Sequence, residues 1–312
     1  MKRTYFLLQS ILLSGFVFAL FFSICEISGT SGGFKKFNYD NPRYDGKEEF
    51  DPSLSRLNNV DIISTYCDSL YNSTPATAKT NFYTDYTNVV RKVVRKRFYH
   101  GYSTYGFGNN YIALLGEVFY KKGISSIVIP DELLKYPFAA CSQQSIVVME
   151  ILKRKKFVTR KVGFPPVGGA GHFCLEVYYD KNWHFVDPDM EPSLAVLAAY
   201  NYPDANFLAA NKDIIRKAYA NSDPERAVAL FSGNIFYGTP NTFPASIGKL
   251  YQTFSRILSY SLWLFLGILF ILVRRKYLSL SKNHVRNSRI YFPQLDKGTS
   301  SVHYPDFATP GA

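Results

Sequence analysis

Two long apolar segments divide the chain into a central region and two ends. Tyr5–Cys25 and Ile257–Val273 contain no charged residue, and a helix of roughly 20 apolar residues is long enough to cross a bilayer. The second segment reaches that length when it is extended back to Tyr251. We therefore expect transmembrane helices at 5–25 and 251–273. A cleaved signal peptide is the alternative for the first segment, although its apolar part exceeds the usual length of about 7–15 residues.

The central region combines helical and strand patterns. Apolar residues at helical spacing predict three long helices: Val60–Tyr71, Tyr83–Phe98 and Ala139–Lys153. Further helices are expected at Ser193–Ala199, at Ala209–Ala220 and, as a short one, from Asp223-Pro224 onward. Shorter patterns bounded by turn residues predict three strands: Phe157–Val162, His172–Tyr179 and Trp183–Asp187. The Pro- and Gly-rich segment 164–171 is expected to be a loop, and 180–182 a tight turn. The second and third strands would then form an antiparallel hairpin.

Charge and composition limit the kinds of partner. Hydrophobic residues make up 47% of the chain, which excludes a wholly disordered protein. The net charge of +12 at first suggests nucleic-acid binding. However, seven Lys and Arg against two Asp lie after Val273, and Lys2 and Arg3 lie at the other end. The basic residues left in the central region do not cluster as a nucleic-acid-binding surface requires, so we expect no nucleic-acid partner.

The same basic residues predict an orientation in the membrane. Positive flanks of transmembrane helices stay on the cytoplasmic side, and here they lie on the terminal side of each apolar segment. We expect both termini in the cytoplasm and the central region outside it. The expected order is a cytoplasmic N-terminus at 1–4, a transmembrane segment at 5–25, a linker at 26–57, an extracytoplasmic domain at 58–248, a transmembrane helix at 251–273 and a basic cytoplasmic tail at 274–312.

The candidate chemistry lies between Cys141 and Asp187. A thiol nucleophile needs a base within hydrogen-bond reach, and the base needs an orienting group. Cys141 is in the first turn of a predicted helix, where unpaired N–H groups and the helix dipole favour the thiolate and can hold an oxyanion. His172 begins the second predicted strand, and Asp187 ends the third.

The register of the predicted hairpin decides whether His172 and Asp187 meet. With a loop of two or four residues, Asp187 lies opposite Cys174, two residues from His172 and on the same side of the sheet. A three-residue loop would place the two side chains on opposite faces. The proposed chemistry requires the even loop, so we predict it.

Three short motifs in this segment resemble the core motifs of the transglutaminase-like superfamily. They are Phe138–Ser145, with the Cys after small residues, Gly171–Val177, with the His before a strand, and Trp183–Pro188, with the Asp before a proline. The resemblance covers residues 138–188, and Cys174 departs from the aromatic residue that usually follows the His two positions later.

The resemblance implies an α+β fold and a set of roles. The fold is the papain-like core, in which a Cys-bearing helix packs on an antiparallel sheet, here between two transmembrane helices. Carried over residue by residue, the resemblance implies Cys141 as nucleophile, His172 as base and Asp187 as the acid that orients it.

Neighbouring residues leave alternatives open. Asp189 is the second candidate for the orienting acid, and Gln143 and Gln144 are candidate oxyanion donors besides the helix N–H groups. His184 is expected on the opposite face from the candidate acid, in a structural role. His100 lies in an aromatic- and glycine-rich stretch with no partner evident in the sequence.

The remaining cysteines are weaker candidates. Cys174 and His172 share a face, but two such ligands without others do not define a metal site. A disulfide between Cys67 and Cys174 is a further alternative outside the cytoplasm. We expect no metal and no organic cofactor.

These observations favour a membrane-anchored, bacterial-type enzyme with its catalytic domain on the periplasmic side of the inner membrane. It would act on an amide carbonyl of a protein or peptide through a thioester, as an acyltransferase or as an amide or peptide hydrolase. The sequence does not separate these two outcomes and leaves the oligomeric state open. The alternative is a non-catalytic envelope scaffold, or a peptide- or glycan-binding module, on the same fold.

Overall fold

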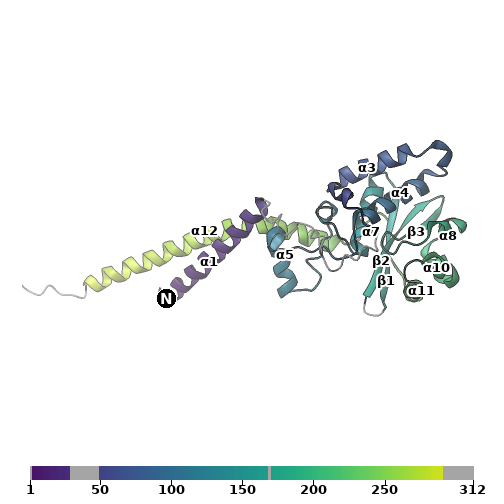
Figure 1. The fold of residues 1–312 in the computed structure, drawn as a ribbon. Coiled ribbons are helices and arrows are strands. Elements are labelled where there is room, and N and C mark those ends of the chain that lie inside the picture. Colours follow the sequence, from purple (N-terminus) through teal and green to yellow (C-terminus); the bar gives the residue numbers. More distant parts are fainter. Residues whose placement is uncertain (1, 29–48, 168–169, 291–312) are drawn as a thin grey trace, which may run out of the picture. The chain divides into compact units, whose positions relative to one another are not determined.

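An antiparallel sheet of four strands lies at the centre of the fold, in the order β3-β2-β1-β4. The strands are β1 (Val158–Val167), β2 (Ala170–Tyr179), β3 (Asn182–Val186) and β4 (Phe236–Tyr237). The computed structural model describes residues 2–28, 49–167 and 170–290, and Figure 1 labels its main elements. With the helices described below, the sheet confirms that the protein mixes helices and strands.

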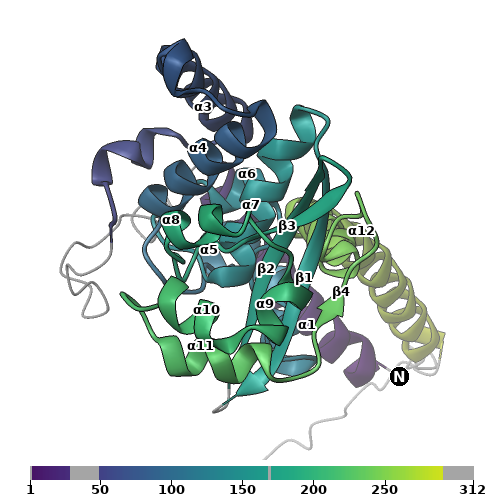
Figure 2. The ribbon, with the colours of Figure 1, turned by 90° about the vertical axis from the view of Figure 1, so that its right-hand side faces the viewer.

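Helices lie on both sides of the sheet (Figure 2). One side is covered by α3 (Val60–Ser73), α4 (Phe82–Arg97) and α7 (Cys141–Arg154). The other side is covered by α8 (Leu194–Ala199), α9 (Ala205–Ala210), α10 (Lys212–Ala218) and α11 (Pro224–Phe231). Because successive strand residues point to opposite faces, Cys174 and Leu175 of β2 belong to different buried clusters. The remaining short elements are η1 (Pro52–Arg56), η2 (Ala76–Ala78), α5 (Phe107–Phe119) and α6 (Pro130–Leu133).

The three long predicted helices are confirmed as α3, α4 and α7, and a side chain binds a backbone N–H at the start of each. Asn59 accepts a hydrogen bond from the N–H of Ile62 at the start of α3, and Asn81 caps α4 in the same way. In α7 the Gln143 Oε1 accepts from the N–H of Ala140 at 3.2 Å. These bonds satisfy N–H groups that have no acceptor within the helix.

The prediction of a loop at 164–171 is wrong, because both neighbouring strands extend into it. β1 runs to Val167 and β2 begins at Ala170. Phe164 pairs with His172, and the register is irregular between this pair and the next one. The two prolines lie in that irregularity, where a missing N–H costs no regular ladder hydrogen bond. His172 is therefore held inside the sheet rather than at the edge of a loop.

The β2–β3 hairpin has the predicted even loop. Tyr179 pairs with Asn182, so the loop has two residues, with φ angles of 47° and 65°. Two successive positive φ angles are the geometry of a type I′ hairpin turn, which matches the twist of the strands. The predicted register is confirmed, and it brings His172 and Asp187 to the same side.

The chain divides into two compact units, which we describe separately: Phe21–Ser261, and Met1–Leu20 with Leu262–Ala312. In the second of these units, the Phe16 and Trp263 rings meet edge to face, with centroids 6.4 Å apart. A Cβ added at Gly267 would lie 3.1 Å from the Phe16 ring, so a small residue permits this helix contact.

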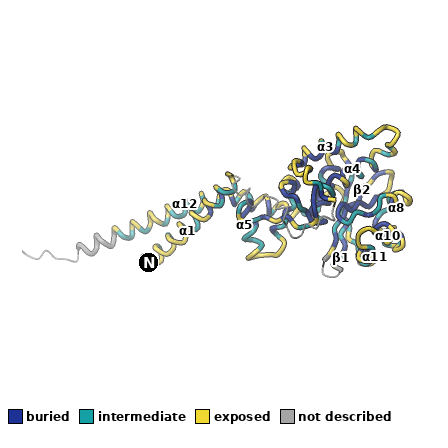
Figure 3. Tube along the Cα trace, viewed as in Figure 1, coloured by how far each residue is buried: buried dark blue, intermediate teal, exposed yellow. Residues whose placement is uncertain are grey.

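The two apolar segments belong to the long helices α1 (Lys2–Ile27) and α12 (Ser246–Ile290). Two stretches, Arg3–Ile27 and Ser246–Lys282, are long and apolar enough to span a membrane. Figure 3 shows mostly exposed and half-buried residues along both helices. The second helix is longer than its apolar segment, so the expected tail at 274–312 is helical as far as Ile290.

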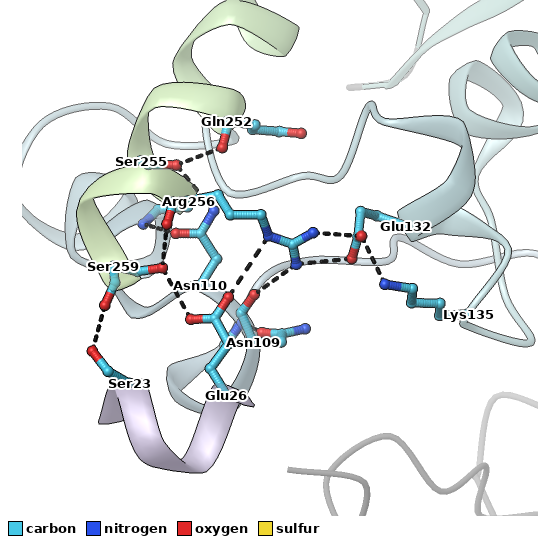
Figure 4. A network of polar contacts seen from close by, with 12 residues as sticks. Ser23, Glu26, Asn109, Asn110, Glu132, Lys135, Gln252, Ser255, Arg256 and Ser259 are labelled. Carbon is cyan, nitrogen blue, oxygen red and sulfur yellow. Dashed lines mark hydrogen bonds and ion pairs between the residues drawn. The ribbon is translucent and has the colours of Figure 1, made fainter. Parts of the chain in front are cut away.

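Polar side chains join α1 and α12 to the domain within the unit Phe21–Ser261 (Figure 4). Arg256 of α12 pairs with Glu132, at 2.9 Å between Nη2 and Oε2, and with Glu26 of α1, at 3.7 Å. The Ser23 hydroxyl donates to the carbonyl oxygen of Ser259 at 2.6 Å. The last turn of α1 and this part of α12 therefore belong to the folded domain.

The expected linker at 26–57 is only partly a linker. Residues 29–48 lie outside the described residues. Leu54 and Leu57, in contrast, are buried in the cluster that contains α3, α4 and α7.

Candidate active site

Cys141 is the first residue of α7 and lies in a buried position. Cys141 lines a pocket, although only 8% of the residue is exposed. Two small residues, Ala139 and Ala140, precede it and are fully buried, so the chain can approach the sheet closely here. The N–H groups of Cys141 and Ser142 lie in the first turn of α7, where a helix N–H has no acceptor within the helix.

His172 and Asp187 form a buried pair beside Cys141. His172 Nε2 lies 2.9 Å from Asp187 Oδ2. The Cys141 sulfur lies within 4.8 Å of a ring nitrogen of His172. The Phe164 ring stacks on the imidazole, with centroids 6.1 Å apart. The structure therefore brings together all three residues that the sequence predicted for the site.

Asp187 makes four hydrogen bonds that use both of its oxygens. Its Oδ1 accepts from the backbone N–H groups of Asp189 and Met190, at 3.0 and 3.1 Å. Its Oδ2 accepts from His172 and from the hydroxyl of Tyr219, at 2.9 and 3.0 Å. Tyr219 follows α10 and was not predicted, because no motif marks a tyrosine 32 residues away as a partner of this acid.

The pKa values of His172 and Asp187 move in opposite directions. Burial favours the neutral imidazole, but the charge of Asp187 and its hydrogen bond to the ring more than offset burial and raise the pKa of His172 above its usual value. Burial also favours the neutral carboxyl, but His172 and the two backbone N–H groups lower the pKa of Asp187 below its usual value. Both shifts favour the charged forms of the pair, an imidazolium beside a carboxylate.

Asp189, the second candidate for the orienting acid, pairs with another histidine instead. Its Oδ1 lies 2.8 Å from His100 Nδ1 and accepts from Gln144 Nε2 at 2.9 Å. A carboxylate oxygen of Asp189 also lies within 4.8 Å of the Cys141 sulfur. His100 therefore has the acidic partner that the sequence left unidentified, and Asp189 borders the thiol directly.

Both amide hydrogens of each candidate glutamine already bind acceptors within the protein. Gln143 Nε2 donates to the carbonyl oxygens of Ser103 and Ile127, at 2.8 Å each. Gln144 Nε2 donates to Ala139 and Asp189. Both side chains hold the start of α7 in place, so the backbone N–H groups remain the candidate oxyanion donors.

His184 is structural, as expected. Its Nδ1 lies 2.6 Å from the carbonyl oxygen of Tyr202, and its Nε2 lies 3.2 Å from that of Tyr179. Its ring also stacks on the Tyr179 ring, with centroids 3.6 Å apart.

The other cysteines of the domain are buried thiols. Burial raises the pKa of Cys67 to about 12 and raises that of Cys174 well above its usual value. They lie in different buried clusters and are unpaired, so the alternative disulfide between them is not formed. Cys174 forms a compact group with His172 and Asp187, and Cys141 forms another with His172 and Asp189. Both groups have ligand types that a metal can use, and both depend on the same imidazole.

A pocket of about 240 Å³ opens at Cys141 and His172. Its lining includes charged groups from helices far apart in the sequence, which the local motifs did not predict. The lining residues are Arg95, His100, Tyr102, Ala140, Cys141, Gly171, His172, Asp189, Met190 and Arg226.

Comparison of the chain with protein-family models, with curated proteins and with solved structures finds no match.

Proposed function

We propose that this protein is a membrane-anchored, transglutaminase-like enzyme that cleaves or exchanges amide bonds through a thioester on Cys141. The main support is the meeting of three groups from three separate elements. Cys141 begins α7, His172 lies in β2, and Asp187 follows β3 and binds the imidazole at 2.9 Å. A nucleophile beside a base, and a base held by an acid, is the arrangement that activates a thiol.

In the acylation step, the Cys141 thiolate attacks the carbonyl carbon of an amide and a C–S bond forms. The carbonyl electrons move to the oxygen, and the N–H groups in the first turn of α7 stabilise that charge. The C–N bond then breaks, and the His172 imidazolium gives its proton to the leaving amine. Asp187 keeps the imidazole oriented throughout this step.

In the second step, His172 accepts a proton from water or from an amine, which attacks the thioester carbonyl. The C–S bond breaks, and the sulfur leaves as a thiolate. Water as acceptor gives hydrolysis, and an amine gives cross-linking. Exclusion of water from the pocket decides between them.

We further propose that α1 and α12 anchor the domain in a bacterial inner membrane, with the domain in the periplasm and both termini in the cytoplasm. The basic residues at the terminal side of each apolar segment support this orientation. Glu26 and Arg256 are the charged residues at the domain ends of these segments, and they pair with each other. Paired charges are expected where a helix leaves the hydrocarbon region.

The proposed nucleophile can be tested by iodoacetamide labelling of the full chain at pH 6. Cys141 should react at least about tenfold faster than N-acetylcysteine, because a free thiol is almost fully protonated at that pH. His172→Gln should remove most of this advantage, and Cys141→Ser should show the background. If Cys141 reacts no faster than the free thiol and His172→Gln changes nothing, the catalytic proposal fails and a binding scaffold replaces it.

The orientation can be tested with reporter fusions after Ala209 and after Ala312. A reporter that works only in the periplasm should be active at the first position and silent at the second. The opposite result would overturn the proposed topology.

A further inference from the structure

We propose that Arg226 binds a carboxylate on the acyl donor, so that the preferred substrates carry an acidic group near the amide that Cys141 attacks. This inference rests on the proposed function and extends it to a substrate class.

All but one of the charged side chains in the pocket lining have a polar partner within the protein. Arg95 Nε lies 3.5 Å from Glu191 Oε2. Asp189 pairs with His100 at 2.8 Å, and the His172–Asp187 pair is described above. Each of these side chains is therefore already engaged with a group of the protein.

Arg226 is the exception. Its guanidinium forms no ion pair or hydrogen bond with any residue that the structure describes. The two acidic residues nearest in sequence are engaged elsewhere: Asp223 accepts from the backbone N–H of Arg226, and Glu225 pairs with Arg216 at 3.0 Å. The exposed side chain of Arg226 thus brings an uncompensated positive charge to the pocket that contains Cys141.

The helix that carries Arg226 is fixed to the strand that carries His172. Phe231 of α11 packs on Phe164, with ring centroids 4.7 Å apart, and Phe164 stacks on His172. Ala227 and Leu230 are also buried in the same cluster. The backbone of Arg226 therefore keeps a constant position relative to the catalytic groups.

A carboxylate is the ligand chemistry that suits this site. The guanidinium is planar and presents paired N–H donors that match the two oxygens of a carboxylate. A pocket of about 240 Å³ holds a group of amino-acid size. An acyl donor with a short acidic side chain or a nearby terminal carboxylate would place its carbonyl at Cys141 and its charge at Arg226.

Two activated esters that differ in charge provide the test: p-nitrophenyl 4-carboxybenzoate, which is anionic, and p-nitrophenyl 4-carbamoylbenzoate, its neutral isostere. The rigid ring keeps the carboxylate away from its own ester. In each reaction the Cys141 sulfur forms a C–S bond with the acyl carbon, and p-nitrophenolate leaves with the electron pair of the C–O bond. The full chain is used in detergent or nanodiscs. Cys141→Ser gives the background, and N-acetylcysteine corrects for the intrinsic reactivity of the two esters.

We expect the corrected anionic-to-neutral ratio of acylation rates to fall by roughly two- to fivefold in Arg226→Gln, in the range of an exposed ion pair. The rate with the neutral ester should stay unchanged, which shows that the variant is folded and active. Arg226→Lys keeps the charge and should retain at least half of the preference. Lys217→Gln is the matched control, because it removes one exposed positive charge from the neighbouring helix outside the pocket lining.

The inference is overturned if Arg226→Gln leaves the ratio unchanged while the neutral ester still acylates Cys141. It is also overturned if Lys217→Gln lowers the ratio as much, because a general field and not a binding contact would then cause the preference. If neither ester acylates Cys141 in the unmodified protein, the proposed function itself fails, and this inference fails with it.

Discussion

At the scale of single residues, Asp187 is the most constrained group of the site. It is fully buried, and four donors from β2, from its own turn and from the end of α10 use both of its oxygens. A carboxylate held in this way cannot rotate away from His172. Asp187 therefore holds the imidazole of His172 in one orientation, as the proposed role of His172 as a base requires.

The four donors of Asp187 predict a graded effect of two substitutions. Asp187→Asn should lower the rate of Cys141 acylation by about 10²–10⁴-fold, because the imidazolium loses its negative partner and its preferred tautomer. Tyr219→Phe removes one of four hydrogen bonds and should lower the rate by less than about tenfold. The p-nitrophenyl esters measure both rates, and thermal melting checks the fold. Equal losses of rate in the two variants would contradict the view that the acylation of Cys141 depends mainly on the charge that Asp187 places beside His172.

The opposite pKa shifts of His172 and Asp187 predict how stability depends on pH. The lowered pKa of Asp187 adds stability above its unfolded value of about 3.9, and this is lost as pH falls towards the folded value. The raised pKa of His172 adds stability below its unfolded value of about 6.5, and this declines as pH rises above it. The contribution of the pair is therefore greatest between about pH 4 and 6.5.

Thermal melting of the unmodified protein and of His172→Gln between pH 3 and 9 measures this contribution. The difference in melting temperature should be largest near pH 5–6 and smaller at both ends of the range. A difference that does not vary with pH would show that the pair does not stabilise the fold through its charges.

At the scale of elements, local patterns predicted the hairpin and the Cys-bearing helix well. The β2–β3 turn and the start of α7 are determined by neighbouring residues, so short patterns located both elements. Counting alone left two hairpin registers open, and the requirement that His172 and Asp187 meet selected the even loop. The β1–β2 connection was mistaken for a loop because its prolines disfavour a regular strand, whereas the structure absorbs them in a local irregularity. Tyr219 and Arg226 were missed because tertiary packing alone brings α10 and α11 to the site.

The close approach of β1 and β2 predicts that any side chain at Gly171 destabilises the fold. A Cβ at this position would lie 2.8 Å from the carbonyl oxygen of Phe164, which is backbone and cannot move aside. Gly171→Ala should therefore lower the free energy of unfolding by about 1–3 kcal/mol. It should also slow the labelling of Cys141, because the added methyl group displaces the strand next to His172.

Gly106→Ala is the matched control for this prediction. A Cβ at Gly106 meets only Asn109 Oδ1, at 3.7 Å, which is an ordinary contact. Denaturant unfolding and iodoacetamide labelling of both variants give the comparison. The prediction fails if Gly171→Ala is as stable and as reactive as Gly106→Ala.

At the scale of the whole molecule, the two helices that are long and apolar enough to span a membrane also contribute to the domain, through their parts within Phe21–Ser261. Gln252 of α12 donates to the carbonyl oxygen of Ser126 at 2.6 Å, and Val128 N–H donates back to Gln252 at 3.0 Å. Ile127, between these two residues, accepts from Gln143 of the Cys-bearing helix. A continuous set of hydrogen bonds therefore links α12 to the start of α7. Cutting the chain at residue 248, the expected end of the domain, would remove these bonds and destabilise the domain.

The ion pairs of Arg256 predict how much stability this link provides. Arg256→Gln leaves Glu132, which is only 7% exposed, with Lys135 as its remaining cationic partner at 2.7 Å. Removing one member of a buried charge pair costs about 3–5 kcal/mol, and the partial exposure of Arg256 lowers our expectation to about 2–3 kcal/mol. The double variant Glu132→Gln with Arg256→Gln should recover part of that loss, because Glu132 then no longer carries a buried charge, although Glu26 still lacks Arg256. Arg216→Gln, which breaks an exposed pair with Glu225, should cost less than about 1 kcal/mol. Denaturant unfolding of the full chain in detergent measures all four proteins. If Arg256→Gln costs no more than Arg216→Gln, the helices serve as anchors alone and do not stabilise the domain.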